Sequence, residues 1–489
     1  MELTISGAEI VAILPAGILV VTGLVQLFAD LGRSAEDKHS EKTHLAMIGV
    51  TGFLLAFAAL FVQGSEASAG ELYAGAMTDD LFGRMGAGVV IMTGLFSTLM
   101  AGSYLASRGS NSAEFTALIS FGAGSMALLC QATNLISIFV AIETLSLAVY
   151  VMAGYFKDER AASEGAFKYF VLGAFSSGFL LLGMAFIYGA TGGSVSLTDI
   201  AASDGQQDTL FSVGTLLVLI GFAFKVGAVP FHSWVPDVYQ GAPVVAVGWM
   251  AVAVKASSLF CLCRFLLFTG GGNDLAQLLA AISVVTMLLG NLAALNQQSL
   301  KRMMAYSGIA HTGYLLIPLV IALSGDGPSA AASIPFYMFA YAATTLAAFG
   351  VLAAISVGSD RDQIHDLDGL AKNRPLLALG FTVALLSLAG IPLTAGFIGK
   401  LLILSDAIQH GFLLLALVGI IASLISVYFY LRPVVSMWFR EPKSSFELVS
   451  ASWGITFTVA VCGFATICIG LFPDWLIDLS KRSVEAILG

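Results

Sequence analysis

Charged residues and cofactor-binding motifs are both scarce in this sequence. Only 11% of the 489 residues are Asp, Glu, Lys or Arg, and the net charge of -9 is spread over loops without a long charged tail. That pattern excludes nucleic acid as a ligand. The five cysteines form no C-x-x-C pair, and there is no H-E-x-x-H motif, heme-attachment motif or glycine-rich phosphate loop. We therefore interpret the cysteines as small packing residues.

Hydrophobic residues make up 58% of the sequence, and its mean hydropathy is +0.90. These values are typical of a polytopic membrane protein. Apolar runs of about 17 to 25 residues, the length that a membrane helix needs, predict fourteen spans. The spans begin near residues 7, 44, 85, 112, 132, 164, 209, 243, 274, 302, 332, 376, 412 and 452. Their length favours helices over barrel strands, and the first run lacks a basic leader, so we expect it to be a retained span.

The basic residues are distributed unevenly between the two sides of these spans. One set of alternate loops carries most of them: Arg33, Lys38, Lys42, Arg108, Lys157, Arg160, Lys301, Arg302, Arg361, Lys372, Arg374, Arg432, Arg440 and Lys443. The opposite loops carry only Arg84, Arg264, Lys481 and Arg482. By the positive-inside rule the first side is cytoplasmic. An even number of spans then places both termini on the outer, periplasmic side.

Three lysines and one glutamate interrupt apolar spans. Lys225, Lys255 and Lys400 lie in the runs LVLIGFAFKVGAVPF, WMAVAVKASSLFCL and IPLTAGFIGKLLIL, and Glu143 lies in NLISIFVAIETLSLAVYV. A lysine at the centre of a membrane helix costs about 2.5 to 3.5 kcal/mol on an insertion scale, so such residues are usually functional. At about 1.5 Å per residue, Lys255 lies about 18 Å past Pro243 in a core about 30 Å thick. We expect the four groups to share one depth and to move charge across the membrane.

Prolines interrupt two of the spans beside these lysines. Pro230 and Pro236 follow Lys225 in the seventh span, and Pro392 precedes Lys400 in the twelfth. A proline removes a helical hydrogen bond, so the freed carbonyls must face protein or water. Two interrupted spans five positions apart indicate an all-α polytopic membrane protein with two inverted five-helix repeats. The expected divisions are three N-terminal helices in 1–110, the repeats in 111–270 and 271–440, and a last span with a short tail in 441–489.

Four stretches resemble subunit N of the proton-pumping NADH-quinone oxidoreductase, respiratory complex I. They are EGAFKYFVLGAFSSGFLLLG (164–183), PFHSWVPDVYQGAP (230–243), SLKRMMAYSGIAHTGYLL (299–316) and GIPLTAGFIGKLLIL (390–404). The buried charges and broken helices are shared by all antiporter-like subunits, whereas KYFVLGAF and PDVYQGAP are more typical of subunit N. The chain ends soon after its last span, unlike subunit L, and Lys400 stands where subunit M usually has glutamate. One departure is VVAVGW at 244–249, where the family has more Thr, Ser and Pro.

The resemblance implies a proton-translocating module without a redox centre of its own. Glu143 and Lys225 would form the charged pair of a first half-channel, Lys255 would be the central relay, and Lys400 would be the gate of a second half-channel. A second tier of proton-transfer residues would be Lys168, His232, Tyr306 and His311. Each of these four also has a structural interpretation, as a snorkelling lysine, a helix cap or a hydrogen-bonded core residue.

The resemblance also implies the surroundings of the chain. Other membrane subunits of complex I and membrane lipids would be its partners in a bacterial inner membrane. NAD, FMN, iron-sulfur clusters and quinone would be held by other subunits of the complex, and no cofactor would be held by this chain.

Two other functions stay open at this point. The chain could be the D-type subunit of a multi-chain cation/proton antiporter, which shares the glutamate, the lysines and a similar twelfth span. It could also be a free-standing secondary transporter, because interrupted helices suit that class as well. A membrane-bound hydrogenase subunit would differ from the first interpretation only in its partner proteins.

Overall fold

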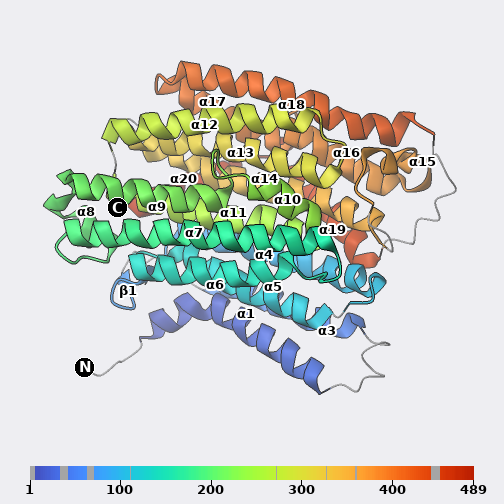
Figure 1. The fold of residues 1–489 in the computed structure, drawn as a ribbon, viewed down its shortest axis with the longest axis horizontal. Coiled ribbons are helices and arrows are strands. Elements are labelled where there is room, and N and C mark those ends of the chain that lie inside the picture. Colours follow the sequence, from blue (N-terminus) through green and yellow to red (C-terminus); the bar gives the residue numbers. More distant parts are fainter. Residues whose placement is uncertain are drawn as a thin grey trace.

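The fold is a bundle of long helices that run roughly along one direction (Figure 1). The computed structural model describes residues 6–32, 42–62, 71–110, 112–270, 272–325, 328–357, 361–441 and 452–488. Its α-helices are α1 (Gly7–Leu31), α3 (Lys42–Val62), α4 (Leu81–Ser107), α5 (Ser112–Gln131), α6 (Leu135–Ala153), α7 (Arg160–Ala190), α8 (Leu197–Ala201), α9 (Thr209–Val226), α10 (Trp234–Gly241), α11 (Val244–Thr269), α12 (Gly272–Leu295), α13 (Leu300–Leu323), α14 (Ser333–Ile355), α15 (Leu370–Asn373), α16 (Pro375–Ala389), α17 (Ala395–Gln409), α18 (Leu413–Phe439), α19 (Trp453–Leu471) and α20 (Asp474–Leu488). The short elements are the strands β1 (Glu71–Leu72) and β2 (Met77–Thr78) and the 3-10 helices η1 (Asp204–Gln207), η2 (Pro328–Ala332) and η3 (Ile364–Leu367).

Thirteen helices of the described chain are long and apolar enough to cross a membrane. Thirteen of the fourteen predicted spans correspond to them, with starts that differ by a few residues. The remaining predicted span, the twelfth, is divided into α16 and α17, and each half is too short to cross alone. The prediction of an all-α polytopic membrane protein is therefore confirmed.

The two spans whose prolines lie beside the buried lysines are broken, and the breaks share one geometry, whereas Pro15, Pro318 and Pro433 lie inside continuous helices. Helix α9 ends before Gly227 and helix α16 ends before Gly390, each glycine in the left-handed conformation with φ of 73° and 84°. The Gly227 amide donates to the Phe224 carbonyl and the next amide donates to Ala223; the pair after α16 is formed in the same way. This is a Schellman cap, which satisfies carbonyls at the end of a helix. The identical caps support the interpretation of two repeats, which stays a prediction.

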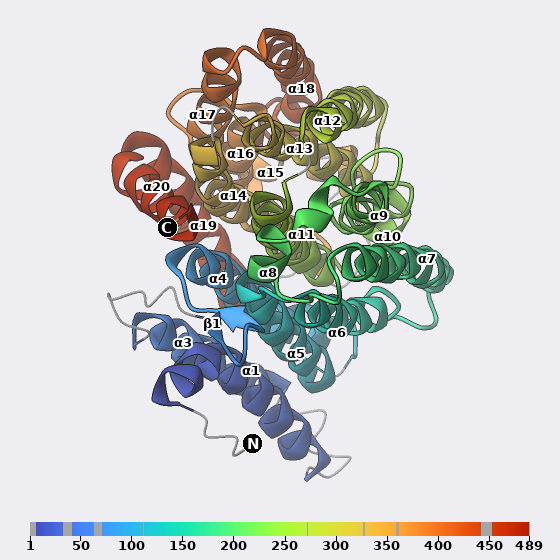
Figure 2. The ribbon, with the colours of Figure 1, turned by 90° about the vertical axis from the view of Figure 1, so that its left-hand side faces the viewer.

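Helix α11 forms the centre of the molecule. All residues of its most apolar 18-residue window are buried, and the same window of α13 and of α14 is 89% buried. Figure 2, which looks along the helices, shows α11 enclosed by α4, α9, α13 and α14, all of which contact it. A helix that is apolar all round is buried on every side, so a charge on α11 faces protein rather than lipid.

Two features at one end of the bundle are not predicted from the sequence. A two-stranded antiparallel hairpin of β1 and β2 precedes α4. Beyond the last span, α20 turns back and packs against α4, α14 and η2 (Figure 2). Helix α20 buries Leu476, Ser480 and Val484 while Trp475 is 57% exposed, so it is amphipathic. The short tail expected after the last span is therefore largely an ordered helix.

Candidate functional site

Lys225 lies in the last turn of α9, immediately before the break, and only 3% of it is exposed. Its Nζ donates a 2.6 Å hydrogen bond to Ser146 Oγ on helix α6. The aromatic rings of Tyr150 and Phe224 lie 5.6 and 5.7 Å from the same nitrogen. One hydroxyl and two ring faces thus surround a buried amine, an arrangement that offsets part of its desolvation.

Glu143 lies one helical turn before Ser146 on α6 and is half-buried. Its carboxylate accepts a hydrogen bond from the Ser177 hydroxyl on α7. Among the described residues no ion pair joins Glu143 to Lys225. Ser146, which the sequence did not single out, accepts from the Lys225 amine, and its own hydroxyl donates to the Ile142 carbonyl. The charged pair that the resemblance implies stays a prediction.

Lys255 lies in the middle of α11 and is 5% exposed. Its Nζ donates a hydrogen bond to the Gly308 carbonyl of α13, and the ring of Tyr341 lies 5.3 Å away. A Cβ atom at Gly308 would lie 3.5 Å from this nitrogen and 3.4 Å from the Tyr341 hydroxyl. A side chain at position 308 would therefore be in van der Waals contact with both the amine and the phenol.

A small cavity of about 10 Å³ joins the first two lysines. Its lining includes Lys225 and Val226 from the end of α9, Lys255 from α11, and Gly308 from α13. About 10 to 15 Å³ of such volume is needed to hold one water molecule, so the cavity has room for about one. The structure thus places Lys225 and Lys255 on two sides of one enclosed space.

His311 lies one turn after Gly308 on α13, and 4% of it is exposed. Its two ring nitrogens are hydrogen-bonded with two tyrosine hydroxyls, Nδ1 with Tyr337 at 2.6 Å and Nε2 with Tyr430 at 3.3 Å. Its ring centre lies 5.2 Å from that of Tyr341, the residue beside Lys255. His311 is therefore part of a buried polar network that begins next to the central lysine.

Lys400 lies in the second half of the broken twelfth span and is 4% exposed. Its Nζ donates to the carbonyls of Leu388 and Ala389 at 2.8 and 3.1 Å, and to Ser423 Oγ at 3.1 Å. These carbonyls belong to the last turn of α16, where carbonyls lack helical partners and favour a positive charge. The ring of Tyr314 lies 5.1 Å from the lysine nitrogen. The break in the helix therefore creates the binding site for this amine.

Three second-tier residues lie away from the buried lysines or lack contacts with them. Lys168 forms ion pairs of 2.8 Å with both Glu164 and Asp237, and 42% of its side chain is exposed. His232 lies in the break between α9 and α10, and its Nδ1 is buried without a hydrogen bond to any described residue. Tyr306 lies on α13 and is half-buried. The structure places Lys168 in a charged cluster at the end of α10 rather than among the buried lysines.

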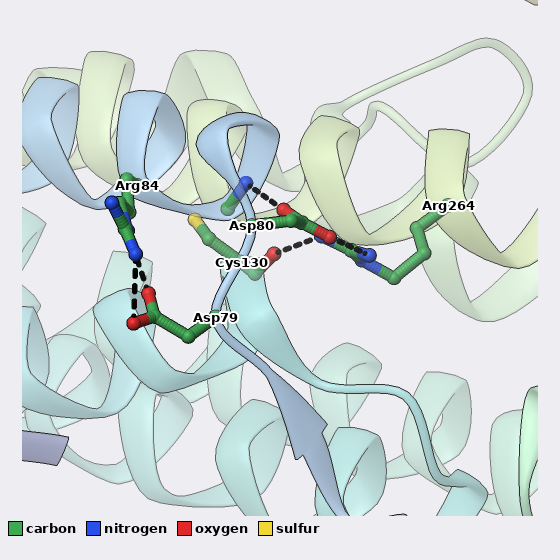
Figure 3. Close-up of polar contacts among 6 residues, drawn as sticks. Asp79, Asp80, Arg84, Cys130 and Arg264 are labelled. Carbon is green, nitrogen blue, oxygen red and sulfur yellow. Dashed lines mark hydrogen bonds and ion pairs between the residues drawn. The ribbon is translucent and has the colours of Figure 1, made fainter. Parts of the chain in front are cut away.

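One buried ion pair was missed in the sequence. Arg264, expected in an outer loop, is 1% exposed on α11 and forms bonds of 2.6 and 2.8 Å to both carboxylate oxygens of Asp80 (Figure 3). Asp80 also caps α4 by accepting from the Gly83 amide at 2.7 Å. The assignment of Arg264 to a loop is therefore wrong, because a bidentate partner 184 residues away allows the arginine to be buried. The sequence signal for this pair is Asp80, because an aspartate directly before a span is a candidate N-cap.

Comparisons with known proteins identify the family of this chain. The family model described as NADH:quinone oxidoreductase/Mrp antiporter, TM matches residues 132–426. NADH-quinone oxidoreductase subunit N of Trichlorobacter lovleyi is 35% identical over 482 residues, which cover 97% of each chain. This chain belongs to the subunit N family. NADH-quinone oxidoreductase subunit N of Chloroflexus aggregans is 36% identical over 498 residues and 100% of each chain.

Solved structures of respiratory complex I and of another membrane complex contain chains with the same fold. A chain of respiratory complex I from Thermus thermophilus with bound aureothin is 30% identical, with a TM-score of 0.81 over 96% of this chain and 99% of that one. A chain of the Mrp complex from Dietzia sp. DQ12-45-1b has a TM-score of 0.84 over 99% of this chain and 100% of that one. Its 20% identity shows the fold alone. The subunit N assignment thus rests on the sequence relatives and on the complex I match.

Proposed function

We propose that this subunit N chain carries protons across the membrane through Glu143, Lys225, Lys255 and Lys400. One observation supports this best: three buried amines lie on or beside broken helices, two of them line one small cavity, and a cluster of aromatic rings extends from the second to the third. Ionisable groups inside a membrane protein are costly, and they mark proton or ion pathways when they face the interior of the bundle.

The first half of the route runs from Glu143 to Lys255. Glu143 and Ser146 lie one turn apart on α6, and the Ser146 hydroxyl, which accepts from the Lys225 amine, can both donate and accept. The proton then crosses the small cavity, where about one water molecule fits between the two lysines. Lys255 has no carboxylate beside it among the described contacts, so its charge depends on the Gly308 carbonyl and the Tyr341 ring.

The second half of the route runs from Lys255 to Lys400 through an aromatic cluster. His311 lies between them, with its ring centre 5.2 Å from that of Tyr341 and 6.1 Å from that of Tyr314. Tyr314 in turn lies beside the nitrogen of Lys400. Imidazole and phenol groups both donate and accept hydrogen bonds, so this cluster has the chemistry that a proton relay requires.

The proposal places the chain in a larger assembly. Its relatives are subunits of NADH-quinone oxidoreductase, so we propose that other membrane subunits of complex I surround it in a bacterial inner membrane, with both termini periplasmic. Electron transfer would take place at NAD, FMN, iron-sulfur clusters and quinone in other subunits. This chain would then be the non-redox translocating part of an oxidoreductase.

The first test is the native assembly and its proton yield. The chain, tagged in its native host and extracted in mild detergent, should co-purify with an NADH-oxidising, quinone-reducing complex. Lys225→Ala and Glu143→Ala should leave that assembly intact and greatly reduce the protons moved per electron. Full pumping by both variants would reject these roles. Recovery with small antiporter subunits, sodium-dependent transport and no NADH oxidation would favour the cation/proton antiporter instead.

The cavity that Lys225 and Lys255 line is too small to be a solute site. A pocket for a small molecule usually has a volume of about 300 to 1,000 Å³. The space between Lys225 and Lys255 is about 10 Å³, which accommodates water and protons but no solute.

A further inference from the structure

Thr312 connects the two lysines that line the small cavity. It lies on α13, one turn after Gly308, and is fully buried. Its Oγ1 lies 2.7 Å from the carbonyl oxygen of Val226, the last residue of α9, and 3.2 Å from the carbonyl oxygen of Gly308. The first acceptor follows Lys225 directly in the chain, and the second accepts the hydrogen bond from Lys255. One hydroxyl therefore contacts the backbone beside both amines.

Each of these carbonyls needs a donor. Val226 ends a helix, where the last four carbonyls have no partner within the helix, and at membrane depth no bulk water replaces that partner. Gly308 is in the interior of α13, but its oxygen also receives the ammonium of Lys255. A threonine hydroxyl in a helix can donate to the carbonyl four residues earlier, which here is that of Gly308.

A hydroxyl has one proton and can rotate between acceptors. When Lys255 is charged and donates to Gly308, the Thr312 hydroxyl is free to donate to Val226, as its shorter distance indicates. When Lys255 gives up its proton and leaves Gly308, the hydroxyl can rotate to that carbonyl and release Val226. The end of α9, with Lys225, is then held less firmly.

We propose that Thr312 is a positioning residue whose hydroxyl alternates between Gly308 and Val226 and so couples the charge of Lys255 to the position of Lys225. A coupling claim requires a two-state element whose equilibrium both sites bias, and the experiment below tests whether this hydroxyl is one. The inference rests on the proposed function, because it assumes that the lysines exchange protons.

The test uses the assembled complex in membranes of the native host. Thr312→Val keeps the shape of the side chain but removes the hydroxyl, and Thr312→Ser keeps the hydroxyl. Thr458→Val is the matched control, since the buried Thr458 donates only to Gly454 of its own helix, at 2.8 Å, among the described contacts. Protons moved per electron are measured over a range of pH, together with uncoupled NADH oxidation.

We expect Thr312→Val to lower the contribution of this subunit to the proton yield about fivefold, the effect of one neutral hydrogen bond, with NADH oxidation and assembly unchanged. Its pH profile should differ from that of the wild type, whereas a merely structural defect would lower the amplitude and leave the profile unchanged. Thr312→Ser should restore both the yield and the profile. If Thr312→Val fails to assemble, Thr312→Cys, which keeps the branch of the hydroxyl but has only a weak donor, takes its place with the same expectation.

The variants separate a failure of the inference from a failure of the proposed function. Wild-type yield and pH profile in Thr312→Val would overturn the inference, as would an equal loss in Thr458→Val or a failure of serine to restore the yield. Lys255→Ala is measured in parallel. If that variant pumps normally, the proposed function fails; if it loses pumping while Thr312→Val does not, only the inference fails.

Discussion

Loss of either member of the buried pair of Asp80 and Arg264 should weaken the attachment of the N-terminal helices to the core. Asp80 caps α4 and Arg264 lies on the central α11, so their two hydrogen bonds join these helices directly (Figure 3). The side chains are 3% and 2% exposed. Removal of one partner leaves an uncompensated buried charge and costs about 3 to 5 kcal/mol, or a factor of about 10² to 5 × 10³ in the folding equilibrium.

The adjacent residue provides the control for this prediction. Asp79 pairs with Arg84 at 2.7 Å, but these side chains are 13% and 12% exposed and both lie on one short segment. We expect Asp79→Ala to cost less than Asp80→Ala, because the Asp79 pair keeps some contact with solvent and joins two residues only five positions apart. The assay is the thermal stability of the detergent-extracted complex, followed by retention of the tagged subunit during size-exclusion chromatography.

A double variant tests whether the unpaired charge causes the loss of stability. Asp80→Leu with Arg264→Met removes both charges together, and we expect it to recover most of the stability lost in Asp80→Ala. Equal stability of Asp80→Ala and Asp79→Ala would refute the reasoning, because it would mean that the Arg264 charge is not buried as described.

Three further predictions concern the buried lysines and their neighbours. Ser146→Ala removes the hydroxyl that accepts a hydrogen bond from the Lys225 amine. We expect the loss of proton yield, measured as protons per electron, to be about tenfold smaller than the loss in Lys225→Ala. Gly308→Val places a branched side chain within contact of the Lys255 nitrogen and should abolish most pumping, whereas Gly178→Val, where a Cβ meets no atom within 4 Å, should pump normally. Lys168→Gln should retain at least half of the proton yield, because this lysine is 42% exposed and paired with surface carboxylates; a complete loss would return it to the relay.

The helix breaks could be predicted because their causes are local. Pro230 and Pro392 each follow a glycine by two or three residues, and those glycines, Gly227 and Gly390, form the left-handed caps. A buried lysine is likewise visible as a charge within an apolar run. The four principal site residues were therefore identified from the sequence, although their roles stay a proposal.

The partners of these residues could not be predicted because they come from distant parts of the chain. Ser423, which binds Lys400, is only one of many serines in the spans, and nothing in its own neighbourhood marks it. Arg264 was misplaced because an arginine near the end of an apolar run has the same local pattern in a loop as in a buried pair. Helix α20 was overlooked because a search for long apolar runs does not detect a 15-residue amphipathic helix.

The central claim is that protons pass through Lys255, the amine on the most buried helix. Its most direct test is the number of protons moved per electron by the assembled complex when Lys255 is replaced by alanine, with NADH oxidation measured in the presence of an uncoupler. The account predicts normal assembly and uncoupled NADH oxidation with a proton yield reduced by the whole contribution of this subunit. An unchanged proton yield in a fully assembled complex would contradict it.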